Sequence, residues 1–280
     1  MGLLAFQGNG HTHLKGEYKT VVKKGWDALL KMQNADGLFL SGGESYNPHH
    51  LLYAQAQATI AICEAYGMSK DTAFKAPAQK SIDFAHKAQA PEGGWRYEPR
   101  IDSDTSVTGW YVMALQTARM AGLEVQSQAE DNVMKFLDSV GHENQSRYSY
   151  KVGQESTLTM TAEGLLCRQY LGWKHADERL KRGVDYLLAN PISYGGGDDV
   201  NVYYWYYATQ VCHHMDGPEW NKWNMSLKQE VPKHQVKTGA EAGSWDPSAD
   251  RWGPHGGRLF TTCLSVYMLE SYYRHNFRLK

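Results

Sequence analysis

The sequence has little cysteine, and its few thiols show no C-x-x-C spacing. The 4 cysteines are Cys63, Cys167, Cys212 and Cys263, and all lie in apolar segments. This pattern excludes the paired thiols of a redox motif or a zinc ribbon. We interpret them as small buried thiols between neighbouring helices. Reduced cysteines are compatible with the cytoplasm and also with a secreted domain that has no disulfide bonds, so the sequence predicts no compartment.

Long apolar runs and net charge are also lacking. No run approaches the roughly 20 residues of a membrane span, and the start of the chain is too short for a secretory signal. The 29 Lys and Arg nearly balance the 30 Asp and Glu, and no basic stripe follows any segment. The sequence therefore predicts no transmembrane segment and no nucleic-acid partner.

A glutamine, then glycine and an aromatic residue, recur at the ends of helical segments. The recurring stretches begin at Gln33, Gln89 and Gln235, and reach Gly37, Gly93-Gly94-Trp95 and Gly243-Ser244-Trp245. The period of roughly 50 residues is typical of stacked helical hairpins. The sequence therefore predicts an all-α repeat fold.

Two kinds of helical segment alternate between these turns. Segments charged on one face span 17–32, 73–88, 128–140, 176–188 and 219–234. Segments that are apolar or small nearly all round span 49–66, 104–120, 156–171, 202–215 and 259–273. The first kind suits an outer layer facing water and the second an inner layer. The alternation predicts an α/α toroid, a six-hairpin α/α barrel.

The ends and loops of this toroid give two further expectations. Leu3–Phe6 before a Gly-rich turn looks like the end of a helix, so we expect one domain over residues 1–280 that is cut from a longer protein, its first helix incomplete.

The links from outer to inner helices are long and rich in Gly, Pro and aromatics. In a toroid these loops share one mouth with the N-termini of the inner helices, and we expect the site there.

Some of these residues resemble a known group. Gly93-Gly94-Trp95, with the Gln turn before it, resembles the Q-W repeats of terpenoid cyclases, and Asp104-Thr105-Ser106 is similar to the catalytic segment of squalene-hopene cyclases. Over its full length the chain resembles the prenyltransferase and squalene oxidase repeat proteins, typical of bacteria such as planctomycetes and mostly without assigned activity. The resemblance implies a toroid of terpenoid cyclase type and an isoprenoid or other apolar ligand.

The chain departs from the motifs of these families at the reactive positions. Squalene-hopene cyclases carry D-x-D-D-T, and aligning Asp104-Thr105 with its end puts Ser103 in place of the proton donor, with Asp102 one residue earlier. Zinc-dependent prenyltransferases carry a His where this chain has Thr261. Complement-type thioester domains need Cys-Gly-Glu-Gln, which is absent. We therefore expect no metal and no cofactor.

Carboxylates stand before several apolar helices. Asp104, Glu155 and Asp199 occupy such positions. One interpretation is helix capping, in which a carboxylate accepts backbone N–H groups and contributes about 1 kcal/mol. The other is that carboxylates facing one another across the mouth raise a pKa enough for general acid work. Asp102 and Asp104 would then be catalytic, and Glu155 and Asp199 would contact the ligand.

Aromatic residues are the other candidates for ligand contact. Five of them, from Tyr203 to Tyr207, fall in one helix. They either pack in the core or line the axis as a wall for an apolar ligand or a cation. Under the second interpretation Tyr203 and Tyr207 contact the ligand, together with Trp95 and Trp245 of the repeated turns.

The longest polar loop precedes the last apolar helix and carries Asp246, His255 and Arg258. Arg258 at a helix start resembles an anion clamp, which makes all three candidates for ligand binding. The alternative is an ion pair between Asp246 and Arg258 that pins the loop. The histidine pairs lack the i, i+4 spacing of a helical zinc site, although a site built across loops from His49, Asp246 and His255 stays open.

Three hypotheses for function follow. The first is a cyclase-like or other isoprenoid-processing enzyme with Asp102 or Asp104 as the acid. The second is a non-catalytic scaffold that binds a lipid or a protein partner at the loop face. The third, ranked behind both, is a glycan-active enzyme on a similar barrel, which predicts paired carboxylates in an open cleft lined by Trp.

Overall fold

The computed structural model describes residues 1–39, 49, 51–195 and 200–274. Within these ranges the regular structure is helical except for one short hairpin of two strands. The helices are α1 (Gly2–Gly8), α2 (Lys19–Lys31), α3 (Leu51–Ser69), α4 (Thr72–Ala88), α5 (Thr105–Ala121), α6 (Ser127–Ser139), α7 (Leu158–Tyr170), α8 (Glu178–Leu188), α9 (Val202–Met215), α10 (Gly217–Lys233) and α11 (Gly253–Arg274). The strands are β1 (Gly141–His142) and β2 (Arg147–Tyr148). The predicted all-α class is confirmed.

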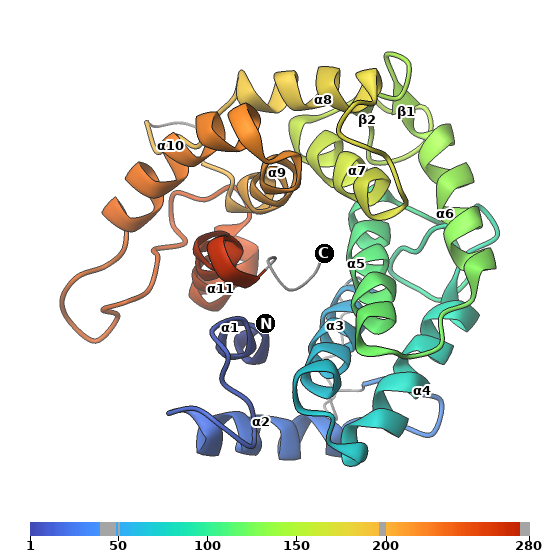
Figure 1. Cartoon of the computed structure of the whole chain (residues 1–280), viewed down its shortest axis with the longest axis vertical. Helices are drawn as coiled ribbons and strands as arrows, with labels where there is room; N and C mark the ends of the chain where they lie inside the picture. Colours follow the sequence, from blue (N-terminus) through green and yellow to red (C-terminus); the bar gives the residue numbers. More distant parts are fainter. Residues whose placement is uncertain (40–48, 50, 196–199, 275–280) are drawn as a thin grey trace. The chain divides into compact units, whose positions relative to one another are not determined.

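The chain divides into two units. The first unit holds residues 1, 3–141 and 149–155, and the second holds residues 2, 142–148 and 156–280. In the first unit α3 packs against α5, and α4 contacts both (Figure 1). In the second unit α9 packs between α7 and α11, while α8 and α10 contact this row. One domain over residues 1–280 stays a prediction.

The two kinds of helix follow the predicted alternation. α5 and α9 bury side chains along nearly their whole length. α8 buries a single face made of Leu180, Val184 and Leu187, and its charged residues lie on the rest of the helix. A helix that is apolar all round loses stability if one face meets water, so such helices form the inner layer of each unit.

The repeated glutamines hold their turns together. Each side-chain amide donates to the carbonyl of the turn glycine: Gln33 to Gly37 at 3.2 Å, Gln89 to Gly93 at 2.8 Å and Gln235 to Gly243 at 2.9 Å. Two of these amides also donate to a carbonyl of the next amphipathic helix, Gln33 to Pro77 at 2.9 Å and Gln89 to Ala129 at 2.8 Å. The glutamine therefore joins one hairpin to the next.

The tryptophans of the turns fill the cores of the units. The indole N–H of Trp95 donates to the Ala85 carbonyl at 2.8 Å, and that of Trp245 donates to the Val231 carbonyl at 2.8 Å. Trp95 has no exposed surface and Trp245 only 3%. Burial of the ring with its N–H bonded is the stable arrangement for tryptophan. Ligand contact by either residue stays a prediction that this placement does not favour.

Replacing Gln89 by alanine is expected to destabilise the chain by about 2–4 kcal/mol, because two buried carbonyls lose their donor. Gln235→Ala is the matched control, since its amide makes only exposed bonds, donating to Gly243 and accepting from Lys237, and we expect a loss below about 1 kcal/mol. Urea unfolding of both variants measures the difference. Equal losses would contradict the role of Gln89 as a buried link between hairpins.

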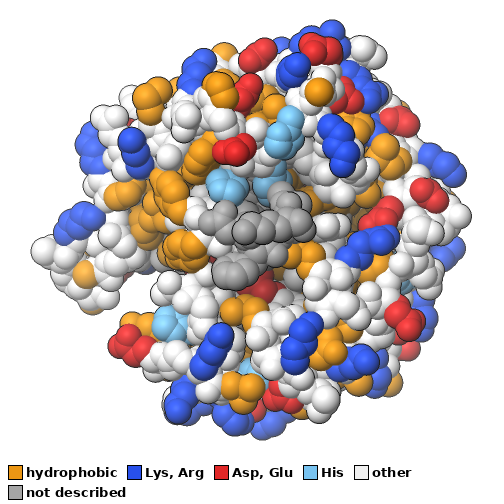
Figure 2. All heavy atoms as spheres, viewed as in Figure 1, with side chains coloured by type: hydrophobic (Ala, Val, Ile, Leu, Met, Phe, Trp, Pro, Cys, Tyr) orange, Lys and Arg blue, Asp and Glu red, His pale blue; other side chains and the backbone are white. Residues whose placement is uncertain are grey.

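The surface of the described residues is polar and mixed in charge. None of their helices combines the length and the apolar character that a membrane span requires. On the face shown in Figure 2, the Lys and Arg side chains are interspersed with Asp and Glu and form no continuous patch.

Candidate functional site

A polar cluster lies in the first unit, between the α4–α5 loop and the segment 149–155. Its members are Arg96, Tyr97, Asp102, Asp104, Tyr150 and Lys151. Two backbone bonds at the start of α5 bring the segments together: Asp104 N–H donates to the Trp95 carbonyl, and Thr105 N–H donates to the Tyr150 carbonyl, both at 3.0 Å. The two loops therefore place their side chains around one helix N-terminus.

Asp104 is the buried carboxylate of this cluster, with no exposed surface. Its Oδ1 accepts from the Val107 N–H at 2.7 Å, which is the predicted helix cap. Its Oδ2 accepts from the Tyr150 hydroxyl at 2.7 Å and lies 3.4 Å from Arg96 Nε. Burial raises the pKa of Asp104 to about 6, although these bonds oppose the shift. Asp104 therefore keeps its proton to an unusually high pH.

Asp102 is the accessible carboxylate, with 29% of its side chain exposed. Its Oδ2 lies 2.6 Å from Arg96 Nη1 and 2.9 Å from Lys151 Nζ. Burial pushes the pKa of Asp102 upward, but the hydrogen bonds and charges of Lys151 and Arg96 outweigh it and leave the pKa below its usual range. One guanidinium thus contacts two carboxylates whose pKa values are shifted in opposite directions.

Aromatic rings flank the carboxylates. The Tyr97 hydroxyl is hydrogen-bonded to the Tyr150 hydroxyl at 2.8 Å. The hydrogen-bonded series therefore runs from Asp104 through Tyr150 to Tyr97. The His49 ring stacks on the Tyr97 ring at 4.6 Å, and the Arg96 guanidinium lies 4.4 Å from the centre of the same ring. Both tyrosines are only partly buried. The cluster therefore combines acid groups, cations and aromatic rings, of which the His49 ring is exposed.

The pKa of Asp104 predicts a pH dependence of stability. The carboxyl loses its proton near its usual pKa of 3.8 in the unfolded chain and near 6 in the folded chain. Between these values the unfolded chain binds fewer protons, so stability falls as the pH rises from about 4 to 6, by on the order of 3 kcal/mol. Asp104→Asn keeps a capping oxygen but does not ionise, and we expect this fall to disappear in urea titrations. A fall that persists would contradict the assignment to Asp104.

The candidates in the last long loop are placed on the surface of the second unit. Asp246 and His255 are exposed. Arg258 lies 2.7 Å from Glu241 Oε2 and 3.3 Å from Asp246 Oδ2, so its charge is balanced by two carboxylates. This is the ion pair that pins the loop, the second of the two interpretations. Anion binding there stays a prediction.

The remaining candidates fall outside the cluster. Glu155 is exposed, and Asp199 lies outside the described residues. Tyr203 and Tyr207 are buried in the second unit, where the Tyr203 hydroxyl donates to Glu163 Oε1 at 3.4 Å. Burial raises the pKa of Tyr207 far above its usual value. Among the described residues no three His, Cys, Asp or Glu side chains gather as metal ligands.

The sequence predicted Asp102 and Asp104 as catalytic, which stays a prediction, and it did not predict the residues around them. Arg96 and Tyr97 follow Trp95 directly. They lie in the same long loop as the two carboxylates, and this position could have indicated them. Tyr150 and Lys151 carried no such signal, because they lie 46 and 49 residues along the chain from the carboxylates that they contact. Glu163 was visible as a carboxylate inside an apolar helix.

No protein-family model matches the chain, and no curated protein matches it either. Among solved structures it is similar to GH76A, an α-1,6-mannanase of Salegentibacter sp. HEL1_6. An inactive variant of that enzyme with two aspartates replaced, in complex with α-1,6-mannotriose, shows 12% identity and a TM-score of 0.53 over 91% of this chain and 98% of the other. A second inactive variant, with α-1,6-mannotetrose, shows 11% identity and a TM-score of 0.55 over the same shares.

The chain is also similar to a novel α-amylase from Clostridium perfringens. The identity is 13% and the TM-score 0.65, over 97% of this chain and 85% of the other. At these identities the likeness shows the fold alone. It confirms the predicted α/α toroid class.

The same likeness corrects the family resemblance. The similar structures are a mannanase and an amylase, so the identification with terpenoid cyclases and with prenyltransferase and squalene oxidase repeat proteins is wrong. The isoprenoid-processing hypothesis falls with it. The turns explain why the resemblance was misleading. Their glutamine, glycine and tryptophan residues suggested Q-W repeats, but in the structure they connect helical hairpins and pack between them. Such turns serve the packing of helical hairpins and do not depend on the reaction.

Proposed function

We propose that this chain is a glycan-active enzyme that hydrolyses a glycosidic bond at the Asp102–Asp104 cluster. The observation that carries the proposal is the pair of carboxylates on one guanidinium, with the pKa of one lowered and that of the other raised to about 6. Glycoside hydrolysis uses one ionised and one protonated carboxyl group. The likeness to a mannanase and an amylase supports this reaction class.

Asp102 has the properties of the ionised group. It is partly exposed, and Arg96 and Lys151 stabilise its charged form. Positive charge develops at the anomeric carbon when the glycosidic bond breaks, and a fixed carboxylate beside that carbon lowers the barrier. Asp102 is therefore the proposed catalytic carboxylate, and Arg96 and Lys151 position it.

Asp104 is fully buried, so it acts through its neighbour. The hydroxyl of Tyr150 lies 2.7 Å from Asp104 Oδ2 and is itself only partly buried. In the proposed step the hydrogen bond reverses: the protonated Asp104 donates through Oδ2 to the Tyr150 oxygen, and Tyr150 gives its own proton to the departing glycosidic oxygen. Water then adds to the anomeric carbon, and the proton that it releases returns to Asp104 through the Tyr150 hydroxyl. Asp104 is thus a proton reservoir, and Tyr150 is the group that touches the substrate.

The exposed His49 ring is the proposed surface for the sugar, because His49 and Arg96 both lie against the Tyr97 ring. Tyr97 stacks with His49 and is linked to Tyr150 by its hydroxyl. Sugar rings present apolar C–H faces, which pack against aromatic rings while their hydroxyls bond to polar neighbours. The glycan hypothesis predicts a cleft lined by tryptophan, whereas the rings beside these carboxylates are those of tyrosine and histidine.

The test is sugar release by the wild-type chain from a panel that includes α-1,6-mannan and starch. We expect hydrolysis of at least one polysaccharide, with a bell-shaped dependence of kcat/KM on pH. The basic limb should lie near pH 6, where Asp104 loses its proton, and the acidic limb below about pH 4, where Asp102 gains one. Absence of hydrolysis across the panel would contradict the proposal and favour the non-catalytic scaffold.

A further inference from the structure

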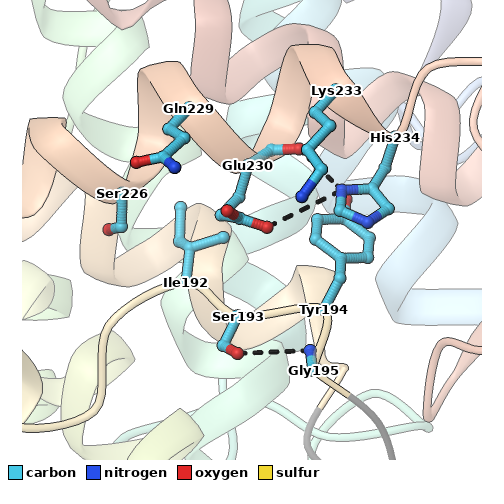
Figure 3. Close-up of a pocket in the computed structure, with 9 residues that line it drawn as sticks. All are labelled: Ile192, Ser193, Tyr194, Gly195, Ser226, Gln229, Glu230, Lys233 and His234. Carbon is cyan, nitrogen blue, oxygen red and sulfur yellow. Dashed lines mark hydrogen bonds and ion pairs between the residues drawn. The ribbon is translucent and has the colours of Figure 1, made fainter.

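A second polar site lies in the second unit, between α10 and the segment Ile192–Gly195 (Figure 3). It is a pocket of about 360 Å³. Its lining consists of Ile192, Ser193, Tyr194, Gly195, Ser226, Gln229, Glu230, Lys233 and His234. The volume falls in the range of small-molecule sites. None of these residues belongs to the proposed catalytic cluster.

One face of α10 forms a wall of this pocket. Ser226, Gln229, Glu230 and Lys233 recur at a spacing of three and four residues, which places them on one side of the helix. Figure 3 shows these side chains directed toward the segment Ile192–Gly195. The buried residues of α10 are Trp223, Leu227 and Val231, which belong to its other, core-facing side. The pocket is therefore bounded by a polar helix face that the core does not use.

The polar groups of this face have unused bonding capacity. Gln229 and Lys233 are exposed at the rim of the pocket, and in the part of the chain that the structure describes their side chains have no protein partner, so water bonds to them when the pocket is empty. The Glu230 carboxylate, 21% exposed, lies 3.9 Å from the His234 ring nitrogen. After burial and the charge of Asp250, its charge also raises the pKa of Tyr194. A partly exposed carboxylate can accept hydrogen bonds from water or from the hydroxyl groups of a bound molecule. An amide, an ammonium and a carboxylate thus border one pocket, and a polar ligand there would replace the water on the two exposed groups.

The far end of the pocket is rigid. The Tyr194 and His234 rings stack at 3.8 Å with an angle of 12° between their planes. His234 is held in turn by its Nδ1, which donates to the Glu230 backbone carbonyl at 2.9 Å. Two stacked rings fixed by a backbone bond lose little entropy when a ligand packs against them. The pocket is therefore preorganised at this end.

The balance of charges and bonding groups defines the ligand. The lining offers one carboxylate, one ammonium, one amide, one imidazole and three hydroxyls, so it holds both donors and acceptors and neither charge is in excess. Such a set suits a neutral molecule with many hydroxyl groups. We infer that the pocket is a saccharide-binding site outside the catalytic cluster. The choice of saccharides among polyhydroxylated ligands rests on the proposed function.

The test is a nitrogen-15 NMR titration of Asp102→Asn, which keeps saccharides intact, with α-1,6-mannotriose and with maltotriose. We expect one of them to shift the amide resonances of Tyr194 and His234. Adding Glu230→Ala or Lys233→Ala should weaken that binding at least about tenfold, because each removes one of the few polar contacts. Lys228→Ala, an exposed lysine of α10 that does not line the pocket, is the control and should leave it unchanged.

Two outcomes would overturn the inference. In the first, neither saccharide shifts the resonances of residues 192–195 and 226–234. In the second, the shifts persist at the same affinity in Glu230→Ala and Lys233→Ala. The proposed function fails separately: pocket shifts that depend on Glu230, combined with no hydrolysis by the wild-type chain, would support the saccharide site and reject the enzyme.

Discussion

Replacing Asp102 by asparagine is expected to lower kcat for glycoside hydrolysis by about 10³-fold, equivalent to about 4 kcal/mol of transition-state stabilisation. Asparagine has the same shape but no charge, so the developing positive charge at the sugar loses its counter-charge. The fold should survive, because the side chain is partly exposed and the amide oxygen still accepts from Arg96 and Lys151. Initial rates on the best substrate of the panel, with circular dichroism as a check of folding, measure the effect.

Asp177→Asn is the matched control for this change. Asp177 also pairs with an arginine, Arg179, at 2.7 Å, and its pKa is lowered to about 2 mainly by the hydrogen bond from that side chain. It caps α8 in the second unit and has no role in the proposed reaction. We expect its activity to equal that of the wild type. If Asp102→Asn retains comparable activity, Asp102 is not the catalytic carboxylate.

Replacing Gly93 by alanine is expected to destabilise the chain by about 4 kcal/mol or more. Gly93 has a φ of +103°, which L-residues rarely adopt, and an added Cβ would lie 2.2 Å from the Asn132 carbonyl oxygen and 2.7 Å from its carbon. The strained backbone alone contributes about 1–3 kcal/mol, and relief of the clash requires α6 to move. For a chain of this size we expect the melting temperature to fall by roughly 10 °C.

Gly122→Ala separates the two causes. Gly122 ends α5 with a φ of +82°, but no atom lies within 4 Å of the position of an added Cβ. This change therefore tests backbone strain without a clash, and we expect a loss of about 1–2 kcal/mol. Thermal unfolding of both variants gives the comparison. Losses of the same size would show that the close approach between Gly93 and α6 contributes nothing.

The sequence alone predicted the two layers of helices and the positions of the repeated turns. Helical periodicity and the contrast between charged and apolar faces are local properties, so α5 and α8 were assigned to different layers without any knowledge of contacts. The cap at Asp104 was likewise visible, because a carboxylate before an apolar helix meets backbone N–H groups of its own segment.

The same local information misled the assignment of a family. Glutamine, glycine and tryptophan at a turn are selected by packing, as the bonds of Gln89 and Trp95 show. Packing is common to all toroids of helical hairpins, whereas chemistry depends on a few side chains. A motif made of packing residues therefore identifies the fold and leaves the reaction open.

Only the tertiary structure decided what surrounds the carboxylates. The sequence placed Asp102 and Asp104 two residues apart, but it did not show that Lys151 and Tyr150 reach them from a later loop. That contact makes Asp102 a stabilised anion, while burial makes Asp104 a weak acid. A pKa depends on all charges and solvent within several ångströms, and residues distant in the chain supply most of them. Local sequence fixes which groups are present, and folding fixes their environment.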